Sequence, residues 1–269
     1  MDAPEPSPPA ARARRAPPPF LPLEVRRTEP RGPHLVRVTL GGPGLADFPP
    51  PGPAASVRVL LPPPRAGRLV LPAWTGNEFL LPDGRRPIIR TLTPRHVDHR
   101  SLELDVEVVV HGEGAASSWA RDASTGDPVA VSGPGRGYGI DAAAPAFLLG
   151  GDETALAALA QLLEALPPAT PVAVHIEVAT PDGRVLLPEH PGARLQWWVR
   201  SRHEPPGAAL VAAVRGAPLH PGTRVWVAGE ASAVQQLRRY LFEERGLPRA
   251  HAAVRGYWKH GRQGGSDDA

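Results

Sequence analysis

The sequence pattern of this chain changes near residue 145, and that change restricts the folds open to it. Before Pro145, short runs rich in β-branched residues alternate with Pro and Gly turns such as Gly41-Gly42-Pro43-Gly44. After it, apolar strand-like runs alternate with helix-like stretches. Many short strands between turns are typical of an antiparallel barrel, whereas alternating strands and helices are typical of a parallel sheet. The sequence therefore predicts a β-barrel followed by an α/β domain, with the boundary near residues 142–145.

The pattern also locates the expected elements. In the first domain, strands are expected at 21–28, 34–40, 56–61, 68–71, 87–93, 102–110 and 127–132, with a short helix near 115–121. In the second, strands are expected at 146–149, 172–179, 195–199, 224–227 and 251–255, and helices at 155–166, 208–214 and 230–245. The Pro/Ala/Arg-rich residues 1–19 and the tail 263–269 are expected to be disordered. The predicted domains are therefore 20–144 and 145–262.

Composition excludes several classes of function. The chain of 269 residues has no cysteine, which excludes disulfides, thiolate-bound iron–sulfur clusters and a cysteine nucleophile. Redox chemistry in such a chain requires a bound organic cofactor. The pI is near 9.9, but no basic helix face or interleaved aromatic run accompanies it, so we expect no nucleic-acid partner. No apolar run approaches the ~20 residues of a membrane span, so we expect no membrane span and a cytoplasmic location. Nothing in the sequence suggests an obligate interface, so we expect a monomer.

The segment Arg90-Thr91-Leu92-Thr93-Pro94-Arg95, followed by Asp98, closes an extended run and is the most informative motif. Alternate side chains of one strand can be presented to a single ligand. Arg90 and Thr93 bracket a place where a phosphate and a flat polar ring fit together. The alternative is a solvated strand face, which is the commoner role of Arg and Thr on a strand.

A second motif runs from His111 to Trp119 and places small residues at the start of a helix. Small side chains at Gly114, Ala115 and Ala116 let backbone N–H groups approach a pyrophosphate, whose charge the helix N-terminus favours. Ser117 can add a hydroxyl donor. A tight turn with a serine cap is the alternative, but Arg90 upstream supplies the missing counter-charge and favours phosphate binding.

A third group of candidates lies where strands are expected to end. Gly150-Gly151-Asp152-Glu153-Thr154 separates a strand from a helix, and Gly229-Glu230 repeats the arrangement later in the chain. Open α/β sheets bind ligands at the carboxyl ends of their strands. Asp152 and Thr154 can equally be helix N-caps. The glycines of 133–139 do not open a helix, so that segment fails the dinucleotide fingerprint and is predicted to be a flexible crossing between domains.

Other conspicuous residues have weaker signals. Trp197-Trp198-Val199-Arg200 is predicted as a buried strand with one exposed ring, after which Arg200 or Arg202 can meet a 2′-phosphate. Gly256-Tyr257-Trp258-Lys259 either brings an aromatic ring to a flavin or packs it in the core. The chain lacks a Gly-x-Ser-x-Gly elbow and metal-ligand spacing of histidines, so neither a serine hydrolase nor a metal site is expected. Five histidines are assigned to the surface: His190, His203, His220, His251 and His260.

Together these motifs resemble the siderophore-interacting protein family, the FAD-dependent ferric-siderophore reductases of the ferredoxin-reductase superfamily. The resemblance runs from about residue 20 to 262 and rests on five ordered segments. They are Arg90–Arg95 with Asp98, His111–Trp119, Gly151–Ala155, Val225–Glu230 and Gly256–Trp258. The resemblance implies an antiparallel Greek-key FAD-binding barrel and an NAD(P)-binding α/β domain. It further implies an oxidoreductase that uses NADPH or NADH to reduce a ferric siderophore and release Fe(II).

The resemblance also implies roles for individual residues. Arg90 would contact the FAD phosphates, Thr93 would hydrogen-bond near the reactive flavin nitrogen as the catalytic residue, and the Gly114–Ser117 backbone would hold the pyrophosphate. The full set of cofactor-binding candidates is Arg90, Thr91, Leu92, Thr93, His111, Gly114, Ala115, Ala116, Ser117, Trp119, Gly151, Asp152, Glu153, Thr154, Arg200, Gly229, Glu230 and Trp258. Lys259, Arg65 and Arg68 are candidates for steering an anionic ferric siderophore.

One departure from the family pattern concerns the flavin. The family usually has Tyr at the position of Leu92, and that ring stacks on the flavin; Ser118 also stands where the family often has Arg. Leu92 can cover a flavin ring but cannot stack on it. Two alternatives to the siderophore reductase therefore stay open. One is a flavin reductase with another acceptor, such as free flavin, a quinone or an electron-transfer protein, and the other is a non-redox binding protein without flavin.

Overall fold

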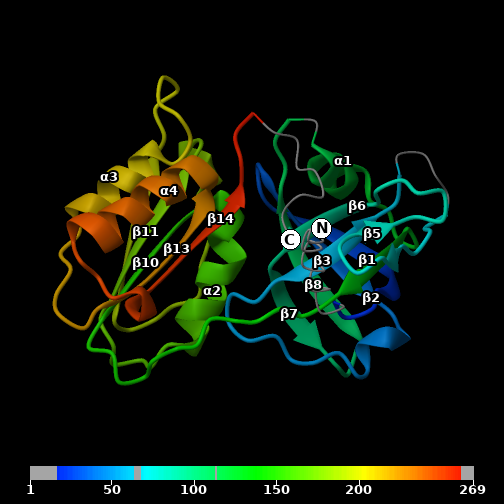
Figure 1. The fold of residues 1–269 in the computed structure, drawn as a ribbon, viewed down its shortest axis with the longest axis horizontal. Helices are drawn as coiled ribbons and strands as arrows, with labels where there is room; N and C mark the ends of the chain where they lie inside the picture. The colour runs from blue at the N-terminus through cyan, green and yellow to red at the C-terminus, as the bar shows by residue number, and fades with distance from the viewer. Residues whose placement is uncertain (1–16, 64–67, 113, 262–269) are drawn as a thin grey trace, which may run out of the picture.

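The computed structural model describes residues 17–63, 68–112 and 114–261, and it has the two-domain architecture expected from the sequence (Figure 1). The predicted leader 1–19 lies mostly outside these residues, and the predicted tail 263–269 lies wholly outside them. An antiparallel barrel-like sheet forms the first domain, and a parallel sheet flanked by helices forms the second. Among the described residues, the first sheet ends at Ser132 and the second begins at Phe147.

Within the described residues, the first domain is a seven-stranded antiparallel sheet in the order β6-β3-β9-β1-β2-β8-β7. Its strands are β1 (Leu21–Gly32), β2 (Leu35–Gly41), β3 (Val57–Leu61), β6 (Ile88–Leu92), β7 (Pro94–Asp98), β8 (Glu103–Val109) and β9 (Pro128–Ser132). The edge strands β6 and β7 are consecutive in the chain and meet at Thr93, so the two ends of the sheet are brought together there. Helix α1 (Ala115–Asp122) follows β8.

Alternating side chains explain the barrel core. Strand β8 shows buried residues at Leu104, Val106 and Val108, with less buried residues between them. This period of two places one face of the strand inside the barrel. Two short 3-10 or hairpin pieces complete the domain: η1 (Pro43–Leu45) and the pair β4 (Ala73–Trp74) and β5 (Phe79–Leu80).

The second domain, over the residues described, is a five-stranded parallel sheet in the order β12-β11-β10-β13-β14. Its strands are β10 (Phe147–Asp152), β11 (Val172–Val178), β12 (Ala193–Val199), β13 (Arg224–Glu230) and β14 (Ala252–Trp258). Its α-helices are α2 (Leu156–Ala165), α3 (Ala208–Gly216) and α4 (Ala231–Arg239). Shorter turns are η2 (Glu153–Ala155), η3 (Pro181–Gly183), η5 (Arg249–His251) and the π-helical η4 (Tyr240–Glu244).

The helices cover opposite faces of this parallel sheet. Helix α2 packs its leucines against Leu149, Ile176 and the fully buried Trp226, on the face that also meets the barrel domain. Helices α3 and α4 pack on the other face, around Leu148 and Val227. Figure 1 shows α2 between the sheet and the barrel, with α3 and α4 on the outer side. The two domains therefore meet through α2 and β14.

Four sequence-based expectations differ from the structure. Residues 68–71 form a bend and loop instead of a strand, because Pro72 donates no backbone N–H and the run has no neighbouring strand with which to pair. Strand β12 is an edge strand and is not buried, although one exposed ring was expected there and Trp198 is 37% exposed. His190 is buried, and its ring contacts the Pro167 carbonyl at 3.1 Å and the Gly192 N–H at 3.1 Å. The expected crossing at 133–139 is tied to the barrel by bonds from Gly135 N to Ser56 O and from Tyr138 N to Pro53 O.

Candidate functional site

Arg90, on strand β6, is the residue best suited to bind an anionic ligand. Its guanidinium is half-buried, and Nη1 donates to the carbonyl of Ile89 at 2.7 Å. Burial lowers the pKa of Arg90, and no carboxylate of the described residues pairs with it. A desolvated cation without a counter-ion is unfavourable unless a ligand supplies the negative charge.

The turn from β8 into α1 leaves room for that ligand. Gly112 lies at a left-handed φ of 58°, and a Cβ on Gly112 or Gly114 would meet no described atom within 4 Å. Gly114 begins α1 without a side-chain cap, so among the described residues no side chain takes up the first helical N–H groups. These N–H groups suit an anion.

Side chains around this turn hold it in shape. The buried Ser117 hydroxyl accepts from His111 N at 3.2 Å and donates to His111 O at 3.0 Å. Arg121 Nη2 donates to the Gly112 carbonyl at 2.8 Å. Thus Ser117 acts here on the loop itself, and its hydroxyl is already engaged. The indole N–H of Trp119, on α1, is buried and has no hydrogen-bond partner among the described residues.

Thr93 lies at the corner between β6 and β7 and is buried. Burial raises the pKa of the Tyr257 phenol of β14, and the neighbouring Thr93 hydroxyl opposes that shift. Leu92 is half-buried and packs against the barrel core. Thr91, which precedes Leu92, is exposed. Arg90, Leu92 and Thr93 therefore line one end of the barrel, at the junction with the α/β domain.

Across this junction, Trp258 at the end of β14 connects the two domains. Its indole Nε1 donates to Asp152 Oδ2 at 2.8 Å, and its ring lies 5.8 Å from the His111 ring between centroids. His111 belongs to the glycine-containing turn before α1. The structure thus brings together two expected cofactor-binding residues that are 147 positions apart in the chain, at 111 and 258.

The carboxyl ends of β10 and β13 are joined by Asp152. The buried carboxylate accepts bonds from Thr154 N, Thr154 Oγ1, Glu230 N and Trp258 Nε1. Burial raises the pKa of Asp152, and these donors oppose that shift because they hold the anion. Glu230 in turn caps α4 through Ser232 N and Ala233 N. Both expected site residues therefore also act as helix caps.

The strand-end glycines are packed against protein atoms. A Cβ on Gly151 would lie 2.5 Å from the Ala155 Cβ, and one on Gly229 would lie 2.7 Å from Asp152 Oδ2. Gly151 is required by internal packing, and Gly229 both by packing and by its φ of 158°. Glu153 is half-buried, and burial raises its pKa.

Sequence reasoning missed a third carboxylate of this kind. Glu177, at the end of β11, is 3% exposed and accepts from Gly207 N at 2.7 Å and from Leu210 N at 2.9 Å. It caps α3, and burial raises its pKa. The sequence signal was a lone Glu at the end of an apolar strand. Arg200, the expected 2′-phosphate residue, is half-buried just beyond β12 and interacts electrostatically with Glu177 and Glu153.

The three substrate candidates are not gathered in one place. Lys259 is exposed directly after Trp258, at the end of β14. Arg68 is exposed in the loop between β3 and β4. Arg65 lies outside the described residues. Of the two described candidates, Lys259 directly follows the site residue Trp258. The described residues contain no cluster of three or more His, Asp or Glu side chains that could hold a metal ion.

Comparison with known proteins identifies the family. Residues 144–261 match the family described as Siderophore-interacting protein, and residues 24–138 match the Siderophore-interacting FAD-binding domain. The chain belongs to the siderophore-interacting protein family. Its barrel is accordingly the FAD-binding domain of that family, and the two-domain fold is that of ferredoxin reductases. No helix in the described residues is long and apolar enough to cross a membrane.

Named relatives agree with this family. An uncharacterized protein of Mycobacterium tuberculosis is 38% identical over 91% of this chain and 92% of its own. The ferric vibriobactin reductase ViuB of Vibrio cholerae is 30% identical over 85% of each chain. A solved siderophore utilization protein from T. fusca is 34% identical, with a TM-score of 0.82 over 93% of this chain and 97% of that one.

More distant structures share the fold alone. Phthalate dioxygenase reductase, which is 19% identical, superposes with a TM-score of 0.58 over 92% of this chain and 70% of that one. That protein is a modular structure for electron transfer from pyridine nucleotides to a [2Fe-2S] centre. The siderophore-interacting chain described here therefore shares its barrel and α/β architecture with redox proteins.

Proposed function

We propose that this protein is an FAD-dependent reductase that uses NADPH or NADH to reduce a ferric siderophore, from which iron is released as Fe(II). The proposal rests on two observations: Arg90 is half-buried without a carboxylate partner among the described residues, and the N-terminus of α1 has no side-chain cap. An unpaired cation and unused helical N–H groups suit the diphosphate of FAD. Membership of a family with an FAD-binding domain supports the same assignment.

The residues of the barrel fit FAD as follows. Arg90 and the backbone of Gly114–Ser117 would hold its diphosphate, Leu92 would cover the flavin ring, and Thr93 would hydrogen-bond near its reactive nitrogen. Trp258 and His111 would close the site from the α/β side, where Asp152 fixes the indole. When bound, FAD supplies the conversion of a two-electron reductant into single electrons for Fe(III).

The pyridine nucleotide has a less complete site. The N-termini of α3 and α4 are capped by Glu177 and Glu230, so their N–H groups are already occupied. Arg200 is the cation at this edge of the sheet that we assign to the nucleotide. The other residues expected to bind the nucleotide would shape the crevice at the strand ends. They are Gly151, Asp152, Glu153, Thr154, Gly229 and Glu230. We derive no chemical step from this part of the molecule.

Relatives support the choice of acceptor. ViuB is named as a ferric vibriobactin reductase, and the T. fusca protein as a siderophore utilization protein. Ferric siderophores are often anionic, so Lys259 beside Trp258 suits the approach of such a complex. Fe(III) prefers hard oxygen ligands more strongly than Fe(II) does, so reduction favours release of the iron.

The visible spectrum of the purified protein with added FAD tests the proposal. Under anaerobic conditions, flavin bands should bleach with NADPH or NADH and return when a ferric siderophore is added. Return of the bands with free flavin or a quinone but not with the siderophore would instead support the alternative acceptor. A protein that takes up no FAD would contradict both and leave the non-redox alternative.

A further inference from the structure

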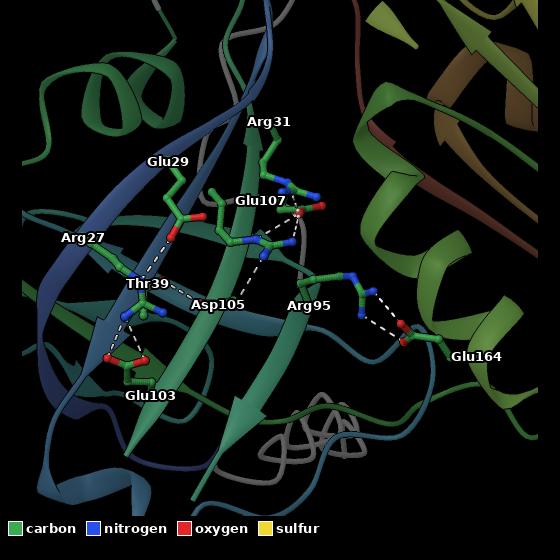
Figure 2. Close-up of polar contacts among 10 residues, drawn as sticks. Arg27, Glu29, Arg31, Thr39, Arg95, Glu103, Asp105, Glu107 and Glu164 are labelled. Carbon is green, nitrogen blue, oxygen red and sulfur yellow. Dashed lines mark hydrogen bonds and ion pairs between the residues drawn. The ribbon is translucent and has the colours of Figure 1, made fainter. Parts of the chain in front are cut away.

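The corner of the flavin-site strand meets the α/β domain at three consecutive residues. The Thr93 hydroxyl lies close enough to the Tyr257 phenol of β14 to lower the pKa of that phenol. The Pro94 carbonyl accepts from Gln161 Nε2 of α2 at 2.5 Å. Arg95 pairs with Glu164 of α2 through bonds of 2.9 and 2.6 Å (Figure 2). The proposed flavin site is therefore held from the other domain as well as from its own.

Gln161 makes a further contact with the barrel domain. Its Oε1 accepts from Ala54 N at 3.0 Å, while its Nε2 donates to Pro94 O. One carboxamide thus uses its acceptor and its donor on two segments of the barrel, the approach to β3 and the β6–β7 corner. An apolar side chain of the same size cannot make either bond, and a shorter amide cannot reach both.

Ala54 shows that the barrel side of this contact needs support. Its φ is 53°, a left-handed conformation that is unfavourable for a residue with a Cβ. Its N–H bonds Gln161, and its carbonyl accepts from Arg255 Nη1 of β14 at 3.3 Å. Two side chains of the α/β domain therefore hold one strained residue of the barrel domain from both sides.

Beside Gln161 the seam between the domains opens into a groove of about 770 Å³, whose lining includes Gln161, Arg95, Glu164 and the prolines Pro50, Pro51 and Pro53. Polar contacts across the seam therefore border the groove, next to the apolar cluster that joins Ala54 to α2. Glu164 is 46% exposed in the Arg95 pair, and exposed ion pairs contribute little. The half-buried Gln161 is the stronger fastening.

We propose that Gln161 is a positioning residue for the flavin, which acts by fixing the Pro94 carbonyl and, through it, the Thr93 hydroxyl. The peptide between Thr93 and Pro94 is planar and the proline ring fixes φ. A fixed Pro94 carbonyl therefore limits the positions open to Thr93. This inference rests on the proposed function, because it takes Thr93 to be a flavin contact.

A double-mutant cycle between Gln161 and Thr93 tests this role. Gln161→Met keeps the side-chain length and removes both hydrogen bonds, and Thr93→Val removes the hydroxyl at nearly constant shape. Two quantities are measured on each variant: the Kd for FAD, from flavin fluorescence, and the two-electron reduction potential of the bound flavin. Gln235→Met, on the exposed side of α4, is the matched control for the same change of side chain.

Gln161→Met should weaken FAD binding about fivefold to tenfold when Thr93 is present and less than twofold in the Thr93→Val background. The reduction potential of the bound flavin should likewise shift more when Thr93 is present than in the Thr93→Val background. For this two-electron couple, a tenfold change in the ratio of oxidised to reduced flavin corresponds to about 30 mV. Gln235→Met should change neither quantity. Equal effects of Gln161→Met in both backgrounds, or no effect in either, would overturn the positioning role.

Two further comparisons separate a failure of Thr93 or of folding from a failure of the role of Gln161. If Thr93→Val alone leaves FAD binding unchanged, the proposed contact of Thr93 fails, which is distinct from failure of the role of Gln161. Should Gln161→Met not fold, Gln161→Glu replaces it, since that variant keeps the acceptor for Ala54 N and removes only the donor to Pro94. Gln161→Glu should then show the same dependence on Thr93, and additive effects would overturn the inference.

Discussion

At the scale of single residues, Arg90 and Leu92 share one face of β6 but differ in how well they suit a flavin. Arg90 is desolvated and lacks a carboxylate partner among the described residues, which favours a phosphate. Leu92 offers an aliphatic surface that packs on the barrel core, at a position where the family usually has Tyr. We therefore expect the affinity for FAD to depend on contacts with its phosphates more than on stacking against its ring.

Leu92→Tyr should strengthen FAD binding. An aromatic contact adds about 1 kcal/mol beyond area burial, which corresponds to about a fivefold lower Kd. Fluorescence titration with FAD measures the change. Leu92→Met, which keeps an apolar and unstacked side chain, is the control and should alter the Kd by less than twofold. A Kd that is unchanged or higher for Leu92→Tyr would show that the ring does not lie over this position.

At the scale of elements, the last strand of the chain is joined to the first strand of the α/β domain by a side chain. Trp258, at the end of β14, donates to the buried carboxylate of Asp152 at the end of β10. Strand β13 lies between them in the sheet, so this bond spans the strand ends. Asp152 also caps η2 and bonds Glu230 N. The bond therefore ties three strand ends together.

Trp258→Phe should lower the free energy of unfolding by about 1–3 kcal/mol, because a donor is removed from a buried carboxylate. Urea unfolding followed by far-UV circular dichroism measures the loss. The matched control is Trp198→Phe on the edge strand β12, where the indole is 37% exposed and bonds His175 Nδ1 at 3.3 Å. The loss from the control should stay below about 1 kcal/mol. Equal losses in both variants would contradict the special role of the bond to Asp152.

At the scale of the whole molecule, an exposed lysine lies at the end of β14, next to the proposed site. The chain has a formal charge of +3, and Lys259 is exposed directly after Trp258. A cation at the mouth of a site raises the rate of encounter with anionic ligands, and salt screens that effect.

Lys259→Ala should raise the KM for an anionic ferric tris-catecholate several-fold and leave kcat nearly unchanged, because the ammonium acts on approach. The increase should shrink as ionic strength rises from about 0.01 to 0.5 M. Arg239→Ala, which removes an exposed cation from α4, is the control and should not change the KM. An unchanged KM for Lys259→Ala at low salt would rule out this role.

The sequence by itself determined the local and periodic features of this protein. The change of pattern near residue 145 predicted the order of the barrel and the α/β domain, because strand and helix periods are properties of neighbouring residues. The motif from Arg90 to Thr93 predicted an extended segment, and its role in a flavin site stays a prediction. The edge position of β12 and the burial of His190 were not predicted, because burial depends on which elements lie beside a segment.

The tertiary structure alone decided the contacts between distant segments. Gln161 and Ala54 are separated by 107 positions, Trp258 and Asp152 by 106, and Arg95 and Glu164 by 69. No local period encodes such pairs, because they arise only when the barrel closes at Thr93 and α2 is placed against it. Likewise the glycines at 151 and 229 suggested a ligand in the sequence, whereas folding fills their space with Ala155 and Asp152.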